Sequence, residues 1–151
     1  MLDKLKKYPV PIITVFIWIG FVCSISFMES WIKFHAENVT LPIGLSIGRV
    51  VFGALNKVEW AFAILILAYL TFCKSRLAFR DLIYYIAAAV LLILQTFWLL
   101  PVLDIRAGII IQGGSVPPSP LHFFYVAIET LKIVCLFLFG SRLFKYFENK
   151  I

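Results

Sequence analysis

Four long apolar segments, each carrying or bordered by ionisable side chains, restrict the folds that are open to this chain. Residues 11–34, 43–73, 81–100 and 121–139 consist mainly of Ile, Leu, Val, Phe and Ala, and each is long enough to cross a hydrocarbon core of about 30 Å as a helix. Backbone polar groups inside a bilayer must be bonded internally, which leaves helices or a closed barrel. Because the runs are continuous rather than alternating, helices are selected. The sequence therefore predicts an all-α four-helix transmembrane bundle forming a single domain.

Composition excludes a soluble fold, and the distribution of charge indicates how the helices are oriented. Hydrophobic residues make up 62% of the 151 residues, against about 45–50% in soluble domains. The net charge of +6 does not indicate nucleic acid, because most cations flank the apolar runs, the pattern typical of cytoplasmic loops. We therefore expect both termini to be cytoplasmic and the connections 35–42 and 102–120 to be outside. The flanking cations form three clusters: Lys4, Lys6, Lys7; Lys74, Arg76, Arg80; and Arg142, Lys145, Lys150.

The glycines and the connecting segments predict where the helices make close contacts and where they end. Gly44 and Gly48 form a G-x-x-x-G pair, which permits close helix contact. The second span would be about 46 Å long as one helix, so its outer part tilts, kinks near Gly53 or projects from the membrane. We expect residues 104–112 to form a short interfacial helix and Gly140 to cap the fourth span.

Polar side chains inside the spans follow helical stripes. His122, Tyr125, Glu129 and Lys132 have the spacing i, i+3, i+7 and i+10, which places them on one face. Charges in a bilayer are costly, so they normally pair or face protein or water and mark a working site. Since these residues fall in the middle and outer parts of the spans, we predict a polar cavity open to the outside. The predicted ligand- or proton-binding residues are Glu29, Arg49, Asn56, Lys57, Glu59, His122, Tyr125, Glu129 and Lys132.

A purely structural role for these residues is an alternative. Ion pairs such as Arg49–Glu59 or Glu129–Lys132 would also fix the packing of the helices. Lys33 and Arg106 lie near the interface, where long cations reach toward water as anchors.

The acidic residues and the two histidines also raise metal or haem binding as alternatives. Glu29, Glu59, His122 and Glu129 are plausible hard ligands, but the E-x-x-H pairs of di-iron bundles are absent. His35 and His122 lack a haem-binding context. No cofactor and no metal ligand is predicted, and a metal or haem stays an alternative.

The first half of the chain contains three recognisable motifs. They are W-x-G at 18–20, F-x-E-x-x-x-K-F at 27–34 and G-R-V-V-F-G-A-L-N-x-x-E at 48–59. Together they resemble small bacterial four-span integral membrane proteins of unknown function. The resemblance implies a four-helix bundle in the bacterial cytoplasmic membrane and brings no activity with it.

Three functional hypotheses follow. The leading one is non-enzymatic: the cavity binds or passes a small polar ligand or protons, with Glu59 and Glu129 as central carboxylates. The second is an accessory subunit of a larger membrane complex, or a homo-oligomer, that uses the Gly44/Gly48 surface. The third is a membrane enzyme, or a metal- or haem-binding protein, acting on a lipid-soluble substrate with Glu129 and His122 as acid and base.

Overall fold

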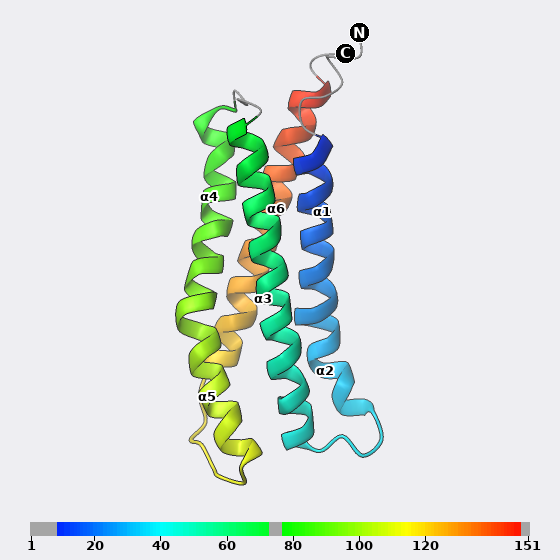
Figure 1. Cartoon of the computed structure of the whole chain (residues 1–151), viewed down its shortest axis with the longest axis vertical. Helices are drawn as coiled ribbons and strands as arrows, with labels where there is room; N and C mark the ends of the chain where they lie inside the picture. The colour runs from blue at the N-terminus through cyan, green and yellow to red at the C-terminus, as the bar shows by residue number, and fades with distance from the viewer. Residues whose placement is uncertain (1–8, 73–76, 149–151) are drawn as a thin grey trace.

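The computed structural model describes residues 9–72 and 77–148 and contains four long, roughly parallel or antiparallel helices (Figure 1). Each helix is long and apolar enough to cross a membrane, which confirms the predicted all-α bundle and indicates a multi-pass membrane protein. The described residues contain no strand. In chain order the helical segments are α1 (Pro9–Val22), a π-helical segment (Cys23–Glu29), α2 (Ser30–Ile32), a 3-10 turn (Lys33–His35), α3 (Leu41–Phe72), α4 (Phe79–Leu94), a second π-helical segment (Gln95–Leu99), α5 (Leu100–Ile111) and α6 (Leu121–Glu148).

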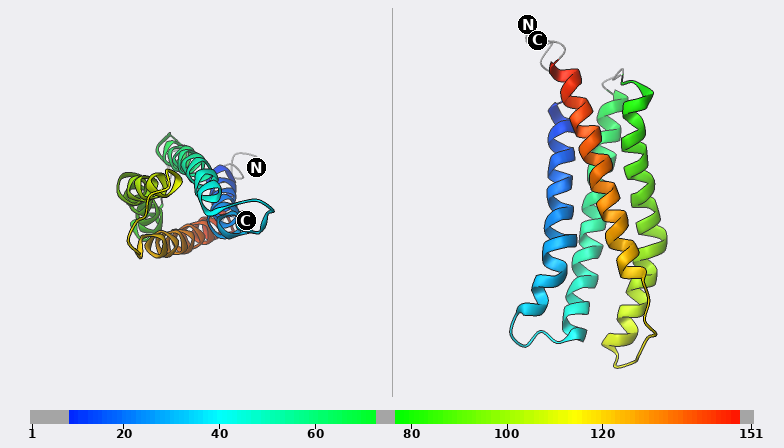
Figure 2. Two further views of the ribbon diagram at one scale, coloured as in Figure 1. Left: turned by 90° about the horizontal axis from the view of Figure 1, so that it is seen from below. Right: turned by 180° about the vertical axis from the view of Figure 1, so that it is seen from behind.

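The helices surround a common interior. α1 packs against α3 and α6, while α4 packs mainly against α6 and α5 mainly against α3. A view along the bundle shows the four helices arranged as a ring (Figure 2). α1 begins and α6 ends at the same end, which we call the terminal end. The opposite, loop end carries the connections at residues 36–40 and 112–120.

The third span is longer than the sequence predicted. Helix continues from α4 through the second π-helical segment into α5, so the separate interfacial helix expected at 104–112 is wrong. Proline lacks an N–H, and its ring clashes with the carbonyl four residues earlier in a regular helix. The wider π-helical turn just before Pro101 gives that carbonyl room, so the helix passes the proline.

The structure differs from the expectation for Gly140. α6 continues through Gly140 to Glu148, so Gly140 does not cap the fourth span. A Cβ at Gly140 would lie 3.1 Å from the Phe16 ring, and the glycine therefore serves close packing of α6 on α1. α3 is one continuous helix through Gly53.

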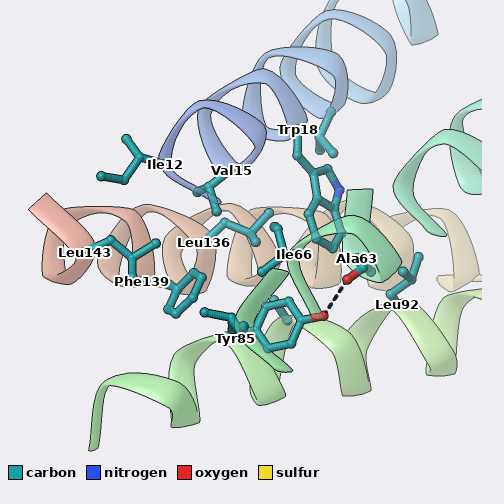
Figure 3. Close-up of a cluster of buried hydrophobic side chains, with 13 residues drawn as sticks. Ile12, Val15, Trp18, Ala63, Ile66, Tyr85, Leu92, Leu136, Phe139 and Leu143 are labelled. Carbon is teal, nitrogen blue, oxygen red and sulfur yellow. Dashed lines mark hydrogen bonds between the residues drawn. The ribbon is translucent and has the colours of Figure 1, made fainter. Parts of the chain in front are cut away.

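An apolar core fills the terminal half of the bundle (Figure 3). Val15, Ile66, Leu136 and Phe139 are completely buried there, and side chains of this kind lie beside one another from α1, α3, α4 and α6. The Tyr85 hydroxyl donates a hydrogen bond to the Ala63 carbonyl at 2.7 Å, which joins α4 to α3. The terminal half therefore contains packed hydrocarbon, and the polar interior lies in the loop half.

The described cations of the flanking clusters lie at the terminal end. Arg142 of α6 forms a 3.5 Å ion pair with Asp81 of α4, and Arg80 and Lys145 belong to the same two helices. The other members of the predicted clusters lie outside the described residues; they are Lys4, Lys6, Lys7, Lys74, Arg76 and Lys150.

Candidate functional site

Lys132 is the centre of a buried group of polar side chains midway along the bundle. Its Nζ lies 2.5 Å from Glu59 Oε1 and 2.9 Å from Glu129 Oε2, and it donates a 2.5 Å hydrogen bond to Gln95 Oε1. The side chains of Lys132, Glu59 and Glu129 are at most 1% exposed. Such charges are sustained in a low-dielectric interior only by close partners.

All four long helices contribute to this group. The Trp18 indole donates a 2.9 Å hydrogen bond to Glu59 Oε1, and the Ser26 hydroxyl donates a 3.3 Å hydrogen bond to Glu129 Oε1. Glu129 and Lys132 are three residues apart on α6, so they share one face of that helix. We call the set Trp18, Ser26, Glu59, Gln95, Glu129 and Lys132 the buried ion cluster.

Both π-helical segments supply this cluster. Ser26 lies within the first segment and Gln95 begins the second. The next residue, Thr96, accepts hydrogen bonds from Asn56 at 2.9 Å and from Trp60 at 3.0 Å, which ties α3 to the second segment. π-helical turns are rare and often occur at functional sites. Two of them at one polar centre therefore favour a site over plain helix packing.

The hydrogen bonding of the cluster is incomplete among the described residues. Gln95 Nε2 is buried without an acceptor, and Glu129 Oε2 accepts no hydrogen bond of normal geometry although Lys132 Nζ lies 2.9 Å away. The cluster also has two carboxyl groups for one ammonium group. Natural proteins satisfy nearly all buried polar atoms, so these unmet groups mark a place that can accept a proton or a small partner.

A cavity of about 610 Å³ lies at the loop end, next to the cluster. Tyr125 lines it, is 3% exposed, and precedes Glu129 by one turn of α6. The Tyr125 ring meets Phe52 edge to face, with ring centroids 5.4 Å apart. Tyr125 therefore stands between the cavity and the buried carboxylates.

Two ion pairs border the cavity. Arg49 of α3 binds Asp104 of α5 through two hydrogen bonds of 2.5 and 2.8 Å. Lys33 lies 3.2 Å from Glu29 Oε2 on the same helix. The expected Arg49–Glu59 pair is wrong, because ten helical residues separate them by about 15 Å. The expected Glu129–Lys132 pair is present.

The structure divides the predicted site residues into two adjoining groups. Glu59, Glu129 and Lys132 form the buried ion cluster, whereas Arg49, Asn56, Lys57, His122 and Tyr125 line the cavity. Glu29 belongs to neither group. It pairs with Lys33 and keeps its Oε1 atom buried without a hydrogen-bond partner among the described residues.

Lys33 was expected to be an interfacial anchor, but its side chain is only 10% exposed and lines the cavity. A Cβ at Gly48 would lie 2.9 Å from Lys33 Nζ, and one at Gly44 only 2.1 Å from the Phe34 ring. The G-x-x-x-G pair therefore makes room for side chains of this chain's first helix. Arg106, the other expected anchor, donates a hydrogen bond to the Pro117 carbonyl in the following connection.

Trp18, Ser26 and Gln95 were not among the predicted site residues. Gln95 carried a usable signal, because it is a strongly polar side chain deep inside a mainly apolar span. Trp18 carried none, since a tryptophan in an apolar run is equally suited to the core, where its ring also packs.

Within residues 9–72 and 77–148, no group of three or more His, Cys, Asp or Glu side chains is placed to hold a metal ion. The likeness of the first half to small bacterial four-span proteins stays a prediction, because no protein-family model, curated protein or solved structure matches the chain.

Proposed function

We propose that this membrane protein binds a small polar ligand in the loop-end cavity and exchanges a proton at the buried ion cluster beneath it. The observation that carries the proposal is Lys132, held between the carboxyl groups of Glu59 and Glu129 with all three side chains buried. With every group ionised, the cluster has one negative charge in excess. An unbalanced charge is costly in a low dielectric, and a proton on one carboxyl group removes that cost.

The surroundings of the cluster suit proton transfer from the cavity. Tyr125 lines the cavity and lies beside Ser26 and Glu129. A phenol both donates and accepts hydrogen bonds, so its hydroxyl can pass a proton between cavity water and Glu129. On the terminal side of the cluster the apolar core offers no comparable route among the described residues. Exchange with the cavity is therefore favoured.

The proposed orientation places the loop end outside the cell and the cation-rich terminal end in the cytoplasm of a bacterial cell. Its support is the clustering of Lys and Arg beside the terminal-end connections, since such cations are retained on the cytoplasmic side. The cavity would then open outward.

Infrared spectroscopy of the reconstituted protein at neutral pH tests the proton site. A protonated carboxyl group has a C=O stretch that a carboxylate lacks. We expect such a band in the parent protein and its loss in Glu59→Gln or Glu129→Gln. Glu37→Gln is the matched control, because Glu37 is exposed in the 36–40 connection. Absence of the band from the parent protein, or its persistence in both Gln variants, would rule out the proposed proton site.

A further inference from the structure

We infer that the ligand of the loop-end cavity is an organic monoanion with an apolar body, bound together with one proton. The inference rests on the proposed function, and it adds the chemical class of the ligand and its coupling to the cluster.

The first argument is the charge of the cavity wall. Three cations line it, and two of them are already neutralised, Arg49 by Asp104 and Lys33 by Glu29. The third, Lys57, makes no ion pair or hydrogen bond with any described residue. Counted over its Lys, Arg, Asp and Glu side chains, the wall has one cation without a counter-charge among the described residues. An anionic group of a ligand would neutralise Lys57.

The second argument is the apolar part of the wall. Phe34, Leu45, Phe52, Leu100 and Leu103 line the same cavity, and its volume of about 610 Å³ lies within the range of small-molecule sites. An inorganic anion would leave these side chains facing empty or wetted space. A ligand with a ring or short hydrocarbon body and one anionic head would meet both parts of the wall.

The third argument is that the buried ion cluster and the cavity wall have charge imbalances of opposite sign. The cavity wall has one cation in excess, and the buried ion cluster has one carboxylate in excess. Glu59, Glu129 and Lys132 do not line the cavity, so a ligand there does not neutralise them directly. An anion beside Lys57 weakens the electrostatic repulsion that a proton entering the cluster meets. Anion binding and proton binding are therefore expected to strengthen each other, and such coupling is reciprocal.

Three ring compounds of similar shape test the ligand class: benzoate, benzamide and benzylammonium. Each is titrated calorimetrically into the protein in lipid nanodiscs, with empty nanodiscs to subtract partition into lipid. We expect saturable benzoate binding, about tenfold tighter than benzamide, as one charge-assisted hydrogen bond provides, and no saturable benzylammonium binding. Repeating the titration in buffers of different ionisation enthalpy counts the protons taken up, and we expect close to one per benzoate.

Three lysine variants test the role of Lys57. Lys57→Gln should lose the preference for benzoate over benzamide, and Lys57→Arg should retain it because the charge is kept. Lys145→Gln is the control, since it removes an exposed cation at the terminal end. Equal binding of benzoate and benzamide, or an unchanged preference in Lys57→Gln, would overturn the inference.

Failure of this inference is separable from failure of the proposed function. If the carboxyl infrared band is present and assigned to Glu59 or Glu129 while benzoate shows no preference, the proton site stands and the anion assignment is wrong. If benzoate binds through Lys57 without proton uptake and the band is missing, the proton site and its coupling are wrong.

Discussion

At the scale of single residues, Trp18 has two roles that belong to different halves of the bundle. Its ring is completely buried in the apolar core, and its indole N–H donates to Glu59 in the buried ion cluster. It therefore marks the boundary between the apolar and polar halves, and it can be altered so that only one role is lost.

Trp18→Phe keeps an aromatic ring in the core but removes the donor to Glu59. We expect the free energy of unfolding to fall by about 1–3 kcal/mol, because the buried carboxylate of Glu59 loses one of its two partners among the described residues and keeps only Lys132. Thermal unfolding in mild detergent measures the change. Trp98→Phe is the control, since Trp98 is 52% exposed on the outside of the bundle, and it should have little effect. Equal effects of the two changes would contradict the role given to the indole N–H.

Lys132→Met should be among the most damaging single changes in the chain. It leaves Glu59 and Glu129 buried without their shared cation, and breaking a buried pair in this way costs about 3–5 kcal/mol. Adding Glu59→Gln and Glu129→Gln to Lys132→Met should recover much of the stability, because uncharged polar groups are cheaper to bury. Unfolding of the single and triple variants in the same detergent compares them, and a triple variant no more stable than the single one would contradict this account.

The ion pairs show what the sequence can and cannot specify at this scale. The Glu129–Lys132 pair was predictable, because both residues lie on one helix at i, i+3. The Arg49–Asp104 pair was not, because 55 positions separate its members and their meeting depends on α5 being an extension of the third span.

At the scale of the helices, two irregular turns and two glycines shape the loop half. Ser26 and Gln95 reach the buried ion cluster from the two π-helical segments, and no local sequence signal marks where a helix widens by one residue. Gly44 and Gly48 were visible as a pair, but their partner was not: they accommodate Phe34 and Lys33 of the same chain. Helix number and type were therefore predictable from apolar runs, whereas helix registers in the polar half were not.

Gly44→Ala tests this close contact. The new methyl carbon would lie 2.1 Å from the Phe34 ring, so the ring must leave the cavity wall. We expect a loss of about 1–3 kcal/mol, as overpacking typically causes, and recovery when Phe34→Ala is added. Gly53→Ala is the matched control on the same helix, because a Cβ there meets no atom within 4 Å. The stability of the three variants in one detergent gives the comparison, and a harmless Gly44→Ala would contradict the contact.

At the scale of the whole molecule, the two ends of the bundle differ in kind. The terminal end has the apolar core and the described flanking cations. The loop end has the cavity and the connections at 36–40 and 112–120. The positions of the charged residues along each span predicted that polarity lies in the middle and outer parts of the bundle. The division of these residues into a buried ion cluster and an adjoining cavity emerged only from the assembly of four helices.

The proposed orientation predicts which residues a membrane-impermeant thiol reagent reaches. In a background where Cys23, Cys73 and Cys135 are replaced by Ser, we expect Ser115→Cys to be labelled in intact cells. Lys145→Cys should be labelled only after the cells are opened, because the proposed orientation places the cation-rich end in the cytoplasm. The reverse pattern would invert the orientation and with it the outward opening of the cavity.

The apolar core on the terminal side of Lys132 has a consequence for transport across the membrane. In this conformation the interior is closed on the terminal side of the buried ion cluster, because the side chains of Val15, Ile66, Leu136 and Phe139 fill it. A ligand bound in the loop-end cavity, as proposed above, would therefore leave from the same end. Carriage to the other side would require α1 and α4 to separate from α6 around Phe139, whereas sensing or storage at one face would require no such separation.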